Sequence, residues 1–126
     1  MRFFSRPALA VVFGAFIACA ETCLHFEDII GVSSWADLPI HDWLAAGLLV
    51  WSGSLSSRNW QDGRPYLIAG WAFMSSLLIG AFLAHWEELS VPAAPDEWIP
   101  PGVFVAIIGG LMTLAIGGLA GSIARR

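Results

Sequence analysis

The chain has 126 residues, of which 57% are hydrophobic and 13% are charged, and its formal net charge is -4. Soluble domains carry roughly a quarter charged residues, so this composition excludes an ordinary soluble domain and indicates an integral membrane protein. The basic residues are all arginines and form no contiguous basic patch, which argues against a nucleic-acid-binding protein.

Four apolar segments of membrane-spanning length follow one another along the chain. We predict transmembrane helices over residues 7–27, 39–57, 65–86 and 102–124. Each segment is long enough to cross ~30 Å of hydrocarbon at ~1.5 Å per residue, and prolines near the segment starts are typical of first helical turns. No segment alternates with period two. We therefore expect a single all-α domain over residues 1–126, a four-transmembrane-helix up-and-down bundle.

Ionisable residues enter at the end of the first predicted span. Glu21 and His25 are four residues apart and Asp28 is three further on, so one helix would place all three on the same face. Glu21 lies roughly 21 Å along a helix from Pro7, inside a ~30 Å hydrocarbon core. An unpaired carboxylate there costs on the order of 2.5–3.5 kcal/mol, so we expect Glu21 to be protonated, paired or bound to a cation.

The first span also permits another interpretation. Two arginines precede a short apolar core that ends in Ala-Cys-Ala, a pattern similar to a secretory signal with a small-residue cleavage site. Cleavage of residues 1–20 would leave three spans and an external N-terminus. Cys19 and Cys23, one helical turn apart, are expected to act as small apolar packing residues rather than as a disulfide.

The charges divide the connections between spans into two classes. All the arginines would lie at one membrane face of a four-span topology, namely Arg2, Arg6, Arg58, Arg64, Arg125 and Arg126. Every acid except Asp62 lies at or towards the opposite face. The positive-inside rule then predicts a multi-pass protein of a bacterial inner membrane with both termini in the cytoplasm.

A histidine stands near the outer end of each of the first three predicted spans. Because successive spans alternate in direction, these ends would meet at one depth beneath the outer, periplasmic face. Imidazole and carboxylate are ligands of zinc, iron, manganese and copper, so we expect a divalent-metal site there. Glu88 or Asp42 would be a ligand or would orient an imidazole. The expected ligands are Glu21, His25, His41, His85, Glu88 and Asp42.

Two other interpretations of these residues stay open. Histidines at one depth on different helices also suit the axial positions of haem b, which would use His25, His41 or His85. Ionisable residues at helix ends can instead cap helices and pair with one another, as in a non-catalytic accessory or assembly subunit of a larger membrane complex. No motif in the sequence identifies a catalytic residue or a reaction.

The fourth predicted span carries small residues in place of ionisable ones. The members of this stripe, at helical spacing, are Ala106, Gly110, Thr113, Gly117 and Gly121. In a membrane, small residues let helices approach closely and gain dispersion contacts. The stripe predicts close packing, either within the bundle or against a second copy in a homo-oligomer.

Three features resemble the small multidrug resistance transporters. The chain has four short spans, an acid preceded by alanine in the first span (Ala20-Glu21), and two glycines one heptad apart in the fourth, Gly110 and Gly117. This resemblance would imply a small proton-coupled transporter that acts through Glu21. The longer acidic loops, the second and third spans and the position of Glu21 near one membrane face depart from that family's pattern.

Overall fold

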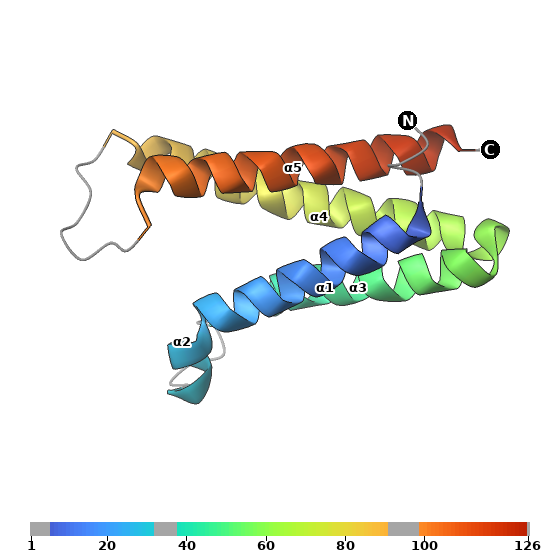
Figure 1. Cartoon of the computed structure of the whole chain (residues 1–126), viewed down its shortest axis with the longest axis horizontal. Helices are drawn as coiled ribbons and strands as arrows, with labels where there is room; N and C mark the ends of the chain where they lie inside the picture. The colour runs from blue at the N-terminus through green and yellow to red at the C-terminus, as the bar shows by residue number, and fades with distance from the viewer. Residues whose placement is uncertain (1–5, 32–37, 91–98, 126) are drawn as a thin grey trace.

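A computed structural model of the chain describes residues 6–31, 38–90 and 99–125, and every regular element among them is a helix (Figure 1). The helices are α1 (Pro7–Leu24), α2 (Phe26–Ile30), α3 (Ile40–Arg58), α4 (Trp60–Glu88) and α5 (Pro101–Ala124). Four of them are long, and α2 is a short helix that follows α1 after a bend. The all-α prediction is therefore confirmed for the described residues.

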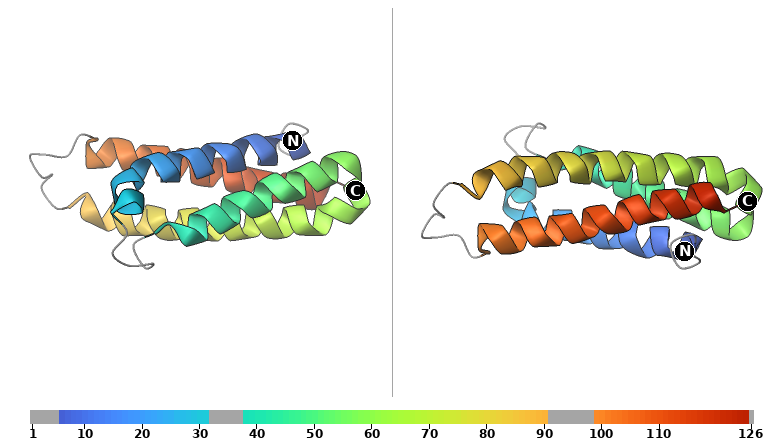
Figure 2. Two further views of the ribbon diagram at one scale, coloured as in Figure 1. Left: turned by 90° about the horizontal axis from the view of Figure 1, so that it is seen from below. Right: turned by 90° about the horizontal axis from the view of Figure 1, so that it is seen from above.

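The long helices pack in chain order, so that each lies beside the next. α1 packs along α3, α3 along α4 and α4 along α5, whereas α1 touches α4 at only a few positions. Both views of Figure 2 place the two chain termini at one end, where α3 connects directly to α4. Towards the other end, which carries α2, the α1–α3 pair diverges from the α4–α5 pair (Figure 1). The bundle is thus closed at the terminal end and more widely spread at the α2 end.

Glycines bring α1 and α3 into close contact. A methyl group added at Gly14 would lie 2.7 Å from the carbonyl oxygen of Ala46, and one added at Gly53 would lie 2.8 Å from the carbonyl oxygen of Pro7. Each glycine therefore faces the backbone of the other helix, and any larger residue would push the helices apart. These two contacts also show that α1 and α3 run antiparallel in a fixed register.

Trp71 of α4 lies at the centre of the bundle core. It is 1% exposed, its ring centroid is 5.3 Å from that of Phe13 on α1, and its ring packs against Gly118 of α5. One side chain thus connects α4 to helices on both sides of it. Many large apolar side chains elsewhere on the helices are exposed, as expected of faces that contact lipid.

Three of the described helices are long and apolar enough to cross a membrane, namely α1, α4 up to Glu87, and α5. α3 is less apolar because it contains His41, Asp42 and four serines. Two of these serines donate hydroxyl hydrogen bonds to backbone carbonyls one turn earlier in α3, which satisfies their polar groups. Its neighbours α1 and α4 also cover part of α3. The structure therefore indicates a helical membrane protein in which α3 is the most polar long helix.

α4 begins five residues earlier than the sequence predicts. The expected start was Pro65, but the helix begins at Trp60, so that only Asn59 separates it from α3. The Asn59 side chain accepts hydrogen bonds from the backbone N–H groups of Gln61 and Asp62 and thereby caps the helix. Pro65 lies inside α4, where it removes one backbone N–H without ending the helix.

α1 ends at Leu24, earlier than the predicted limit of the first span. A bend at His25 separates it from α2, so the helix does not continue through the acidic stretch. Glu21 and His25 flank the last turn of α1, whereas Asp28 belongs to α2. The side chain of Asp28 lies outside the described part of the structure.

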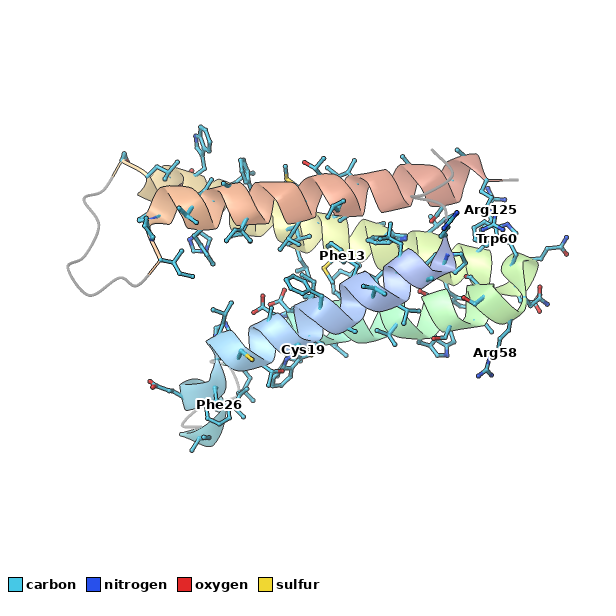
Figure 3. The ribbon with its side chains drawn as sticks, viewed as in Figure 1. Phe13, Cys19, Phe26, Arg58, Trp60 and Arg125 are labelled. Atoms are coloured by element: carbon cyan, nitrogen blue, oxygen red, sulfur yellow. The ribbon has the colours of Figure 1, made fainter. Side chains whose placement is uncertain are left out.

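Two arginines fasten the end of α5 to the start of α4. Arg64 donates hydrogen bonds from Nε and Nη2 to the carbonyl oxygens of Ser122 and Ile123, at 3.2 Å and 2.8 Å. These carbonyls are at the end of α5 and lack partners within the helix, so Arg64 acts as its C-terminal cap. The guanidinium of Arg125 lies 4.0 Å from the ring centroid of Trp60 (Figure 3). The predicted grouping of arginines at one end is confirmed for these two.

The small-residue stripe of α5 is divided between the inside and the outside of the bundle. Ala106 and Gly110 are exposed, whereas Gly121 is buried. A methyl group added at Gly110 would meet nothing within 4 Å, but one added at Gly118 would lie 2.5 Å from the Trp71 ring. α5 therefore packs on α4 through the face that contains Gly118. The residues of the stripe near the N-terminus of α5, such as Gly110, face away from the bundle.

Candidate functional site

The register of α1 and α3 places two carboxylates opposite each other. Gly14 of α1 lies against Ala46, Leu49 and Val50 of α3, and continuing this pairing along the antiparallel helices sets Glu21 level with residues 39–43, the start of α3, which include Asp42. Both side chains are half-buried. The acid that the sequence places inside the first span thus faces a second acid on α3.

His25 lies at the edge of this acidic pair. Its Nε2 atom is 3.6 Å from Oε2 of Glu21, and its charge also acts on Asp42. The His25 side chain is 39% exposed and that of Glu21 is 23% exposed, so the imidazole is the more accessible partner.

His41 lies beside Asp42 in the first turn of α3 and is exposed. It interacts electrostatically with Asp42, as His25 does from α1. The structure therefore gathers four of the six predicted ligands at one end of the α1–α3 pair. We call these residues the acid–histidine cluster, defined as Glu21, His25, His41 and Asp42.

His85 lies on the other helix pair. Its ring packs edge-on against Phe104 of α5, with the two ring centroids 4.8 Å apart. Glu88 ends α4, and its side chain lies outside the described part of the structure. The roles predicted for these two α4 residues at a metal site stay predictions.

The packing register also separates His85 from the cluster along the bundle axis. Gly70 of α4 lies against Leu49 of α3. Continuing this pairing along the two antiparallel helices sets His41 level with Leu78, about 10 Å along α4 from His85 at ~1.5 Å per residue. α4 is longer than α3, so the outer ends of the two helices do not coincide.

The acid–histidine cluster has the composition of a cation site. Two carboxylates facing each other away from bulk water repel one another unless a proton or a cation lies between them. Carboxylate oxygens and imidazole nitrogens together suit first-row divalent metals. Within the residues that the structure describes, no three His, Cys, Asp or Glu side chains lie close enough to hold one ion. Metal binding would therefore require the side chains of Glu21, Asp42 and a flanking histidine to come closer together than they are in this structure.

The two cysteines lie on the same helix as Glu21 but do not pack inside the bundle. Cys19 and Cys23 are free thiols, and both are exposed. Figure 3 shows Cys19 on the outer surface of α1. The prediction that they form no disulfide is confirmed, whereas their exposure shows that they do not pack inside the bundle.

Comparisons with protein families, with curated proteins and with solved structures find no match for this chain. The acid–histidine cluster is therefore the feature of the chain from which a function is inferred. The pairing of Glu21 with Asp42 was not anticipated from the sequence. The sequence feature that determines this pairing is the position of Gly14 and Gly53, which fix the packing register of α1 on α3.

Proposed function

We propose that the protein is a small four-span protein of the bacterial inner membrane that binds a divalent metal ion through the acid–histidine cluster. One observation supports this proposal: the packing of α1 on α3 places Glu21 and Asp42 at the same level of the two helices, beside a histidine that pairs with Glu21. A divalent cation between Glu21 and Asp42 would neutralise both carboxylates at once. The flanking imidazoles of His25 and His41 would add nitrogen ligands.

The donor set favours a metal ion over haem b. Haem would need two imidazoles on opposite faces of the porphyrin, with room for the macrocycle between their helices. Here each imidazole of the cluster lies beside a carboxylate, and His85 packs against an aromatic ring of α5. Zinc, ferrous iron, manganese and cupric copper all accept mixed oxygen and nitrogen ligands, so the proposal covers this class of ion.

Thermal unfolding of the tag-free protein in detergent tests the proposed function. Zinc or manganese at about 100 times its Kd should stabilise the wild-type protein by about 2.7 kcal/mol, because the ion binds only the folded state. The double variant Glu21→Gln/Asp42→Asn keeps the shape of both side chains but loses both charges, and its Tm should not respond to the metal. Equal shifts in the two proteins would show that the ion binds elsewhere.

We also propose that both termini are cytoplasmic and that the cluster faces the periplasm. Gln61 is exposed beside the α3–α4 connection, and Ser90 is exposed beyond the end of α4. In a background with Cys19 and Cys23 replaced by alanine, an impermeant maleimide should label Ser90→Cys in intact cells. Gln61→Cys should react only after lysis. The reverse pattern would place the cluster on the cytoplasmic face.

A further inference from the structure

A hollow on the surface of α1 combines an apolar lining with one positive charge. It has a volume of about 260 Å³ and is lined by Arg6, Ala8, Leu9 and Val12. Apart from the arginine, these residues are all apolar, and Val12 is 66% exposed. The hollow is at the terminal end of the bundle, on the opposite end of α1 from the acid–histidine cluster.

The charge of Arg6 is not used within the described part of the bundle. Arg64 and Arg125 are engaged with α5 and with Trp60, but no described side chain forms an ion pair with Arg6. Asp62 is the one described acid at this end, and it accepts a hydrogen bond from Asn59. Among the described residues, Arg6 therefore presents a positive charge beside the hollow that no acidic side chain pairs with.

The start of α1 adds to this positive potential. Arg6 is the N-cap residue, and its side chain makes no capping hydrogen bond to the helix. The amide N–H groups of the first turn and the positive end of the helix dipole point back towards the start of α1, where Arg6 lies. A ligand that fits here needs a negatively charged group at the helix start and an apolar group along the first two turns.

We propose that this hollow binds an anionic phospholipid of the surrounding leaflet. The lipid phosphate would pair with Arg6 at the start of α1, and an acyl chain would lie along Ala8, Leu9 and Val12. A lipid satisfies both requirements, whereas a soluble anion would leave the apolar lining unused. α1 is long and apolar enough to span a membrane, so the hollow opens directly to the leaflet in which such lipids lie.

Native mass spectrometry of the full-length protein in an uncharged detergent tests this proposal. Phosphatidylglycerol should bind about fivefold more tightly than phosphatidylcholine with the same acyl chains, the advantage expected of one arginine near a lipid surface. Arg6→Gln should abolish this preference, and Arg6→Lys should retain most of it. Excess inorganic phosphate should not displace the lipid.

Arg58 provides the matched control, because it is exposed at the same end of the bundle but does not line the hollow. Arg58→Gln should keep the full preference for phosphatidylglycerol. Equal binding of both lipids to the wild-type protein would overturn the proposal. Equal losses in Arg6→Gln and Arg58→Gln would also overturn it, since they would indicate general surface charge rather than a site. Displacement by phosphate would point to a soluble anion instead.

Discussion

Gly118→Leu is expected to lose most of the stability of the bundle. A β-carbon at Gly118 would lie 2.5–2.7 Å from three ring atoms of Trp71, and that ring is 1% exposed. Trp71 cannot move aside without breaking its contact with Phe13, so α5 must separate from α4. Overpacking of this kind typically costs about 1–3 kcal/mol, and we expect the upper end of this range here because the ring atoms of Trp71 are so close. Thermal unfolding in detergent, followed by circular dichroism, measures the loss.

Gly110→Leu is the matched control on the same helix. Nothing lies within 4 Å of a β-carbon added there, so the folded monomer should keep its Tm. An unchanged Tm for Gly118→Leu would contradict the packing of α4 against α5.

Gly110→Leu also tests whether the exposed part of the stripe contacts a second copy or a larger membrane complex. A smaller particle by light scattering in detergent would support that contact, and an unchanged size would indicate that this face meets lipid.

The second large effect is expected for the facing carboxylates. Glu21→Gln and Asp42→Asn should each weaken metal binding by on the order of 100-fold, since even residues that only orient a ligand cost 10–100-fold. Binding should also weaken on acidification, because carboxylate and imidazole must lose their protons to coordinate an ion. Isothermal titration calorimetry at neutral and at acidic pH measures both effects.

His85→Ala tests whether the metal ligands are only the four residues of the acid–histidine cluster or also include His85, as the sequence predicts. His85 packs against Phe104 on the other helix pair, so its removal should leave metal affinity within about twofold of the wild-type value. A loss as large as that of Asp42→Asn would instead include His85 among the ligands. If Glu21→Gln binds the metal ion as tightly as the wild-type protein does, the acid–histidine cluster is not the metal site.

Much of the helical architecture could be predicted from composition and segment length. Apolar segments of about 20 residues identify membrane helices because the hydrocarbon core requires that length. The helix boundaries are harder to predict from the sequence. Pro65 suggests a helix start, but a proline is also tolerated inside a helix, and Pro65 lies inside α4. The preceding Asn59 was the better start signal, because its side chain caps α4.

The candidate site was predictable in its residue types but not in its geometry. The sequence identified Glu21 as the acid most in need of a partner, because it lies within an apolar span. It did not identify Asp42 as the residue opposite, since that depends on the register fixed by Gly14 and Gly53. The depth of His85 relative to the cluster also depends on how α4 packs against α3, which the residue spacing along the chain does not give, and its predicted role at a metal site stays a prediction.

The metal content of the tag-free protein decides whether the acid–histidine cluster binds an ion. Wild-type protein and the double variant Glu21→Gln/Asp42→Asn would be equilibrated with zinc or manganese, passed through a desalting column and measured by mass spectrometry of the metal. We expect about one ion per chain in the wild-type protein and almost none in the double variant. Equal metal content in the two proteins would contradict a metal site between α1 and α3.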